Sequence, residues 1–217
     1  MNLLMLELKL NTLFQTNISR HSRESGNLEI KLKDPRFHGD DEKNMTTSTL
    51  SPQALAVIDS YEHLKIGSKT INCPYFNNRT TNLRGALRVL VGKGTPGEIA
   101  DEARILSLRD KFELDELNEE DLVKFLTEHH LGLDCAAFVY YILDAELQAT
   151  KQKKLKQLLS FKSKGLFRRL IATFRIVENT GVLVFNENSK EITLEELKPG
   201  DAIIALGGGI RHDYNHI

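Results

Sequence analysis

Apolar side chains recur at helical spacing between residues 50 and 150, and this spacing predicts a largely helical region. Each predicted helix begins at a residue that can accept hydrogen bonds from free backbone N–H groups. The predicted starts are Ser51-Pro52, the capping box Thr95–Glu98, Asn118 and Asp134. The first helix is expected to carry Leu64 on its apolar face and to end at Gly67, and another, with Leu83 to Val91, to end at Gly92.

The period of the pattern changes after residue 180. VLVF after Gly181 is predicted to be a strand, AIIAL at 202–206 a buried strand, and the residues from Tyr214 the start of another. Helices followed by a small antiparallel sheet indicate an α+β fold. Because no partner follows the strand that begins at Tyr214, the sheet is expected to be incomplete. A truncated reading frame is one hypothesis, in which the isolated protein would expose apolar sheet surface and aggregate.

The polar stretch 17–44 shows little periodicity and is predicted to be disordered. Two of its motifs, RHSRESGN and DPRFHGDDE, are similar to the translation of an interspersed bacterial DNA repeat. Met45 is therefore a candidate for the true translation start. The chain therefore divides into a disordered or repeat-derived segment at 1–44, a helical region at 45–130 and a C-terminal domain at 131–217.

Composition excludes several classes of protein. With 41% apolar residues, 27% charged residues and a net charge of −1, the chain is typical of a globular protein without a preferred charged partner. Two cysteines, Cys73 and Cys135, are too few for a disulfide framework or a cysteine-rich zinc site. No run is long and apolar enough to span a membrane, and the N-terminus makes a poor signal peptide. The compartment is left open, cytoplasmic by default, and no cofactor is expected.

A basic insert at about 150–178 interrupts the C-terminal domain. Residues 151–177 contain nine lysines and arginines and no acidic residue. The simpler interpretation is a solvated basic helix pair that covers the core with Leu155 and Leu159. The alternative is a docking surface for an anionic polymer, either cell wall or nucleic acid.

The candidate chemistry centres on Cys135, in the first turn of a helix capped by Asp134 within GLDCAAFVYYIL. Free N–H groups at a helix start favour a thiolate, which is the reactive form of cysteine. The alternative is a cysteine that only fills space in the core. A nucleophilic Cys135 would need a base, and a histidine distant in sequence must supply it. The candidates include the pair His129-His130 and the two C-terminal histidines, His212 and His216.

GLDCAAFVYYIL followed by LKPGDAIIAL, GGG and NHI resembles the NlpC-type cysteine peptidases of bacterial cell walls, a branch of the papain-like superfamily. The resemblance covers about Gly132 to the end. It implies a papain-like α+β fold in which a nucleophile helix packs on a small antiparallel sheet. It also implies Cys135 as nucleophile, His216 as base and the amide bonds of peptides such as the peptidoglycan stem peptide as substrate. Asp134 and His212 are possible supporting residues, with His212 also an alternative base.

The chain departs from the family pattern at three points. Ala136 and Ala137 stand where the family has Ser and Gly, and the third polar residue, which orients the histidine, would lie beyond Ile217. Three other interpretations therefore stay open. The chain could be an inactive or truncated relative that serves as a binding protein, or a helical interaction protein with a core cysteine. It could also hold a metal between His129, His130, His212 and His216.

Overall fold

The computed structural model describes residues 29–34, 49–76, 87–160, 177, 180–208 and 214–217. Its α-helices are α2 (Pro52–Glu62), α3 (Pro96–Asp110), α4 (Glu119–Glu128), α5 (Cys135–Lys151) and α8 (Val182–Glu187). Short 3-10 helices are η1 (Arg88–Val91), η2 (Leu114–Glu116), η3 (Leu155–Gln157) and η4 (Leu194–Glu196). The strands are β1 (Glu29–Asp34), β2 (Leu64–Ile66), β3 (Lys69–Ile71), β4 (Lys190–Glu191), β5 (Ala202–Gly208) and β6 (Tyr214–His216).

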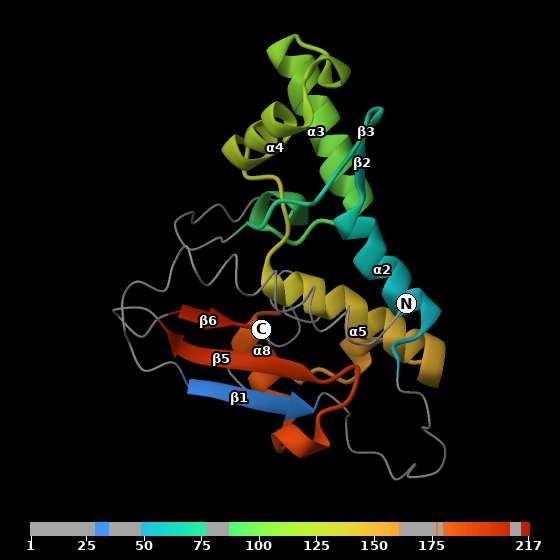
Figure 1. The fold of residues 1–217 in the computed structure, drawn as a ribbon, viewed down its shortest axis with the longest axis vertical. Helices are drawn as coiled ribbons and strands as arrows, with labels where there is room; N and C mark the ends of the chain where they lie inside the picture. Colours follow the sequence, from blue (N-terminus) through green and yellow to red (C-terminus); the bar gives the residue numbers. More distant parts are fainter. Residues whose placement is uncertain (1–28, 35–48, 77–86, 161–176, 178–179, 209–213) are drawn as a thin grey trace, which may run out of the picture.

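The arrangement is α+β, as the sequence predicts. One antiparallel sheet has the strand order β4-β1-β5-β6, and β2 pairs with β3 in a separate hairpin. Helices α2, α3 and α4 lie with the hairpin on one side of α5, and the larger sheet lies on the other (Figure 1). Helix α5 is therefore the element that both halves of the molecule share. Among the described residues, none of the helices has the length and apolar character needed to cross a membrane.

Strand β1 lies within the stretch 17–44, which is predicted to be disordered, so this prediction is wrong for Glu29–Asp34. Glu29–Asp34 pairs with β5 from Glu29↔Leu206 to Lys33↔Ala202, and its end also pairs with β4. In the sequence EIKLKD, charged and apolar residues alternate, which is the pattern of a strand. The pattern is short and lies within a polar stretch, so it does not stand out in the sequence. Strand β5 thus has a partner on both sides, which the expectation of an incomplete sheet did not include. Residues 1–28 and 35–44 lie outside the described residues.

The first helix ends earlier than predicted. The C-cap of α2 is His63, and Leu64 begins a hairpin strand instead of extending the helix face. Leu64 and Ile66 are buried on one face of β2, and Gly67 turns the chain with a φ of 59°. A left-handed residue in a tight hairpin turn favours glycine, so Gly67 marks a turn between strands and not the end of a helix.

The predicted strand VLVF is a helix, α8. Val182 and Phe185 are buried while Leu183 between them is 55% exposed, which is helical and not alternating burial. The Asn188 side-chain amide closes the helix by donating to the Val184 carbonyl at 2.8 Å. A short apolar run is compatible with either a strand or a helix. Here the burial of Val182 and Phe185 on one face is that of a helix.

Two further predictions are tested in part. Of the amphipathic segment Leu83 to Val91, residues 87–91 are described; Leu87 is extended, and Arg88–Val91 form the 3-10 helix η1, closed by Gly92 with a φ of 72°. In the basic insert, Leu155 and Leu159 are buried and the lysines from Lys151 to Lys156 are exposed, as the simpler interpretation expects. However, η3 is a single turn and no long helix follows α5 within residues 152–160; residues 161–176 lie outside the described residues.

Apolar side chains gather in two clusters on either side of α5. The first lies between α2, α3, α4 and the hairpin and includes Leu64, Ile99, Leu122, Leu126 and Ala137. The second lies between α5, η3, α8 and β5 and includes Ala136, Tyr140, Leu143, Leu155, Phe185 and Ile204. Helix α5 therefore contributes to both clusters, with Ala137 in the first and Ala136, Tyr140 and Leu143 in the second.

Candidate functional site

The start of α5 is built as the sequence predicts. Cys135 is the first helical residue, and Asp134 is the N-cap, whose carboxylate accepts a hydrogen bond from the Ala137 N–H at 2.7 Å. The first bond within the helix runs from the Phe138 N–H to the Asp134 carbonyl. The N–H groups of Cys135 and Ala136 precede that bond, so they point out of the helix end beside the half-buried thiol.

Two distant segments hold this helix start in place. Leu133 forms isolated bridges with Tyr75 on one side and Lys93 on the other. Its N–H donates to the Pro74 carbonyl and its carbonyl accepts from the Phe76 N–H, both at 3.0 Å. The Asp134 N–H donates to the Gly92 carbonyl at 2.8 Å. The backbone ahead of Cys135 is therefore fixed by hydrogen bonds to residues far from it in sequence.

Gly132 lies between α4 and α5, at a close approach of two backbone segments. Helix α4 ends at Glu128 with His129 as its C-cap, and the next residue, His130, is left-handed with a φ of 59°. A Cβ atom on Gly132 would collide with the Pro74 carbonyl oxygen and lie 3.2 Å from the Phe76 Cβ. Glycine is needed here because two backbone segments cross in close contact.

The C-terminal strand brings His216 to the same place. In β6, His216 pairs with Ala205 of β5, and Ile217 follows it. The Ile217 N–H and the Tyr75 hydroxyl both form hydrogen bonds with the Cys135 thiol. The Tyr75 ring meets the His216 ring edge-on with centroids 6.0 Å apart. Cys135, Tyr75 and His216, which come from three separate parts of the chain, thus form one cluster.

The charge state of this cluster differs from the expectation for a helix start. The pKa of the Cys135 thiol is raised, first by burial and then by the neighbouring Asp134 carboxylate, against the opposing effects of the hydrogen bonds from Ile217 and Tyr75 and of the Lys93 charge. Burial also lowers the pKa of His216. Both shifts favour the neutral form, so at neutral pH the cluster holds a neutral thiol and a neutral imidazole, each in contact with Tyr75.

Two residues of this region were missed in the sequence. Tyr75 lies in the extended stretch after Pro74, and nothing nearby in the sequence marks it as a partner of Cys135. Lys93 lies between two glycines in VGKGTP, a stretch whose spacing does not match a phosphate loop. It is 6% exposed, and its ammonium lies 2.7 Å from the Asp134 carboxylate. The only local signal is a lysine enclosed by glycine and apolar residues.

His129 and His130 do not join the cluster. The His129 ring packs on Phe125 at 4.5 Å, and its Nε2 lies 3.6 Å from the Asp110 carboxylate. The His130 ring packs against Phe76 at 5.4 Å. His212 lies outside the described residues. Within the residues that the structure describes, no three His, Cys, Asp or Glu side chains are arranged to hold a metal ion.

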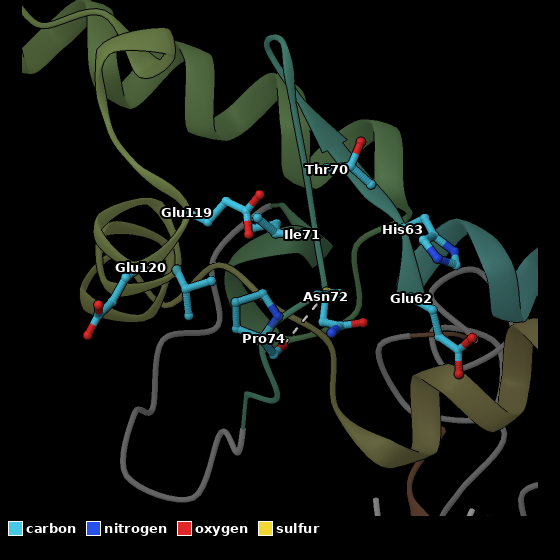
Figure 2. A pocket seen from close by; sticks show the side chains of 10 residues that line it. Glu62, His63, Thr70, Ile71, Asn72, Pro74, Glu119 and Glu120 are labelled. Atoms are coloured by element: carbon cyan, nitrogen blue, oxygen red, sulfur yellow. Dashed lines mark hydrogen bonds between the residues drawn. The ribbon is translucent and has the colours of Figure 1, made fainter. Parts of the chain in front are cut away.

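A hollow of about 630 Å³ is lined by the segment Thr70 to Pro74 and by residues of α2 and α4. Figure 2 shows Pro74 at its centre, between the Glu119 and Glu120 side and the Glu62 and His63 side. Cys73 also lines it, but burial raises the pKa of this thiol to about 12, so the thiol is protonated at neutral pH. Neither Cys135 nor His216 lines the hollow, so it is separate from the cysteine cluster.

No protein family model matches the chain. No curated protein and no solved structure matches it either. The resemblance to NlpC-type peptidases thus stays a prediction from the motifs around Cys135 and His216. The geometry of the cluster provides a separate basis for a functional proposal.

Proposed function

We propose that the protein is a cysteine peptidase or amidase of papain-like architecture, with Cys135 as nucleophile and His216 as base. The observation that carries this proposal is the cluster itself. The Tyr75 hydroxyl and the Ile217 N–H both bond the Cys135 thiol, while the Tyr75 ring packs on His216. A cysteine at a helix start and a histidine on an antiparallel strand, both in contact with Tyr75, bring together the two kinds of group that acyl transfer through a thioester uses.

The reaction would begin when an amide carbonyl carbon reaches the Cys135 sulfur. As the carbon–sulfur bond forms, His216 takes the thiol proton and the carbonyl oxygen becomes an oxyanion. The outward N–H groups of Cys135 and Ala136 supply positive dipoles at the helix end for that charge. The carbon–nitrogen bond then breaks, His216 returns the proton to the leaving amine, and a thioester is left. Water attacks the thioester with His216 again as base and releases the acid and the thiol.

The neutral ground state sets the pH dependence of this mechanism. His216 can accept a proton only when it is unprotonated, and burial lowers its pKa below the ordinary histidine value. The rate of amide cleavage should therefore rise with pH through a pKa below the ordinary histidine value and reach a plateau by neutral pH. Because the pKa of the Cys135 thiol is raised, the proton is expected to leave the sulfur during attack and not before it.

Ala136 and Ala137, at the positions of Ser and Gly in the family pattern, serve packing in this proposal. Ala137 is completely buried in the first core, and Ala136 is 3% exposed in the second. Both methyl groups contribute to packing where α5 is buried on two sides. Tyr75 is 44% exposed, and it provides the accessible surface next to the thiol where a peptide would approach. The proposed peptide is of the cell-wall stem type, as the resemblance implies.

A second candidate is a binding protein that keeps this architecture without cleavage. The raised pKa of the Cys135 thiol favours it, because a buried neutral thiol is a poor nucleophile until a base removes its proton. On this alternative, stem peptides would bind near Tyr75 and leave unchanged. The two candidates differ in whether an amine is released and a thioester forms.

The test measures amine release from peptidoglycan stem peptides, together with the intact mass of the protein after a rapid acid quench. We expect amine release, a thioester adduct on Cys135, and loss of both in Cys135→Ser and His216→Ala. Cys73→Ala serves as the matched cysteine control and should retain activity. Peptide binding without amine release would support the second candidate. Amine release that persists in Cys135→Ser would overturn the proposal.

A further inference from the structure

Lys93 is a buried cation that joins three parts of the molecule. Its ammonium lies 2.7 Å and 2.9 Å from the two Asp134 carboxylate oxygens and donates to the Thr180 carbonyl at 2.8 Å. The Lys93 carbonyl accepts a hydrogen bond from the Tyr141 hydroxyl at 2.6 Å. The residue thus contacts α5 at two places, one at its N-cap and one farther along, and also contacts the segment ahead of α8.

The burial of this ion pair requires an explanation beyond stability. Removing a lysine and an aspartate from water is costly, and well-packed apolar side chains often stabilise a core as well or better. The Asp134 carboxylate already has a capping hydrogen bond from Ala137. An asparagine could provide the same cap with no charge to neutralise. The ion pair therefore matters most for its electrostatic effect on the adjacent residue, Cys135.

The two charges act on the thiol with opposite sign. The Asp134 carboxylate disfavours a negative sulfur next to it, and the Lys93 ammonium favours one. The Tyr75 hydroxyl and the Ile217 N–H form hydrogen bonds with the sulfur, and His216 lies across the Tyr75 ring. Of the groups that act on the thiol, Lys93 is the cation that offsets the capping carboxylate.

We propose that Lys93 is a positioning residue of the cysteine site: its ammonium neutralises the N-cap carboxylate beside the sulfur and holds the start of α5 against its neighbours. The inference rests on the proposed function in one respect, because it gives the reactivity of Cys135 a catalytic purpose. The contacts themselves, and the effect of the charges on the sulfur, are independent of any substrate.

The experiment is a charge cycle read out by alkylation of Cys135 with iodoacetamide as a function of pH, in the Cys73→Ala chain. Lys93→Met leaves the carboxylate unopposed, and the alkylation midpoint should move up by about one pH unit. Asp134→Asn leaves the ammonium unopposed while keeping the cap, and the midpoint should move down by about as much. The double variant should return close to the parent. Lys124→Met, an exposed lysine on α4, is the matched charge control and should change nothing.

If Lys93 and Asp134 had only a structural role, their substitutions would not shift the pH midpoint of alkylation in opposite directions. If the Lys93→Met and Asp134→Asn midpoints move in the same direction, or do not move, the inference is overturned. If Lys93→Met does not fold, Asp134→Asn decides the matter alone: a lower midpoint supports the inference, and an unchanged one overturns it. Lys93→Arg, which keeps the charge, should stay near the parent midpoint.

Failure of the proposed function would look different. In that case stem peptides would release no amine and His216→Ala would not alter alkylation, but the opposite shifts of the charge cycle would persist. Conversely, an active enzyme whose alkylation midpoint ignores Lys93 and Asp134 would retain the proposed function and remove the role of Lys93.

Discussion

Gly132→Ala should loosen the contact that places Tyr75 beside Cys135. The new Cβ would collide with the Pro74 carbonyl oxygen and would also press on the Phe76 Cβ at 3.2 Å. The Pro74 carbonyl cannot yield like the end of a flexible side chain, because it is backbone and accepts the Leu133 N–H at 3.0 Å. The substitution must therefore separate the segment 74–76 from the chain at 132–133.

The expected cost has two parts. Forcing an extra methyl group into close-packed structure costs about 1–3 kcal/mol. Weakening the two hydrogen bonds of Leu133, to Pro74 and from Phe76, adds about 1 kcal/mol for each bond that is lost. Partial relaxation will recover some of this, so we expect the free energy of unfolding to fall by about 2–4 kcal/mol.

Urea unfolding measures the stability, and iodoacetamide alkylation at neutral pH measures the exposure of Cys135. Gly97→Ala is the matched control, because a Cβ on Gly97 meets nothing within 4 Å and the residue lies in the first turn of α3. It should leave stability equal or raise it by up to about 0.5 kcal/mol. If Gly132→Ala is as stable as Gly97→Ala and alkylates like the parent, the close crossing described here is wrong.

Two further predictions concern single hydrogen-bonding groups. Tyr61→Phe should lower the free energy of unfolding by about 1–3 kcal/mol, measured by urea unfolding, because the buried Gly94 carbonyl loses the Tyr61 hydroxyl that donates to it at 3.0 Å; an unchanged midpoint would contradict this. The pKa of Asp115 is lowered by the Ser68 N–H and hydroxyl, so its stabilising effect should be present above the ordinary aspartate pKa and lost as pH falls through the lower folded value. The stability difference between the parent and Asp115→Asn should accordingly shrink in acid, and a difference that stays constant with pH would refute the assignment.

The parts of the fold that the sequence predicts well are those decided by neighbouring residues. Thr95, Asn118 and Asp134 each cap a helix as their positions indicate, because a capping side chain binds an N–H only three residues away. VLVF at 182–185 was mistaken for a strand because its length and composition suit both elements. What decides between them is the burial of Val182 and Phe185 against α5 and β5, which a local pattern does not contain.

The candidate site divides in the same way. Cys135 at a helix start and His216 on the last strand follow from the motifs, and the structure brings both to Tyr75. Their catalytic roles stay predictions. The direction of the Cys135 pKa shift did not follow from the motif, because it depends on how deeply the thiol is buried and on the net effect of two charges. Lys93 was missed because its partner Asp134 is 41 residues away and the pairing exists only once the chain has folded.

Strand β1 has a consequence for how the chain acquires its structure during synthesis. It leaves the ribosome early, but its main partner β5 is Ala202–Gly208, near the other end of the chain. The cluster around Leu64, Ile99 and Leu126 can form long before that, from segments that are closer in sequence. Pairing of β1 with β5 closes a very long loop, so the sheet should be the last part to assemble. The histidine strand β6 pairs on β5 as well, so the cysteine cluster is completed only after both of these late strands have been synthesised.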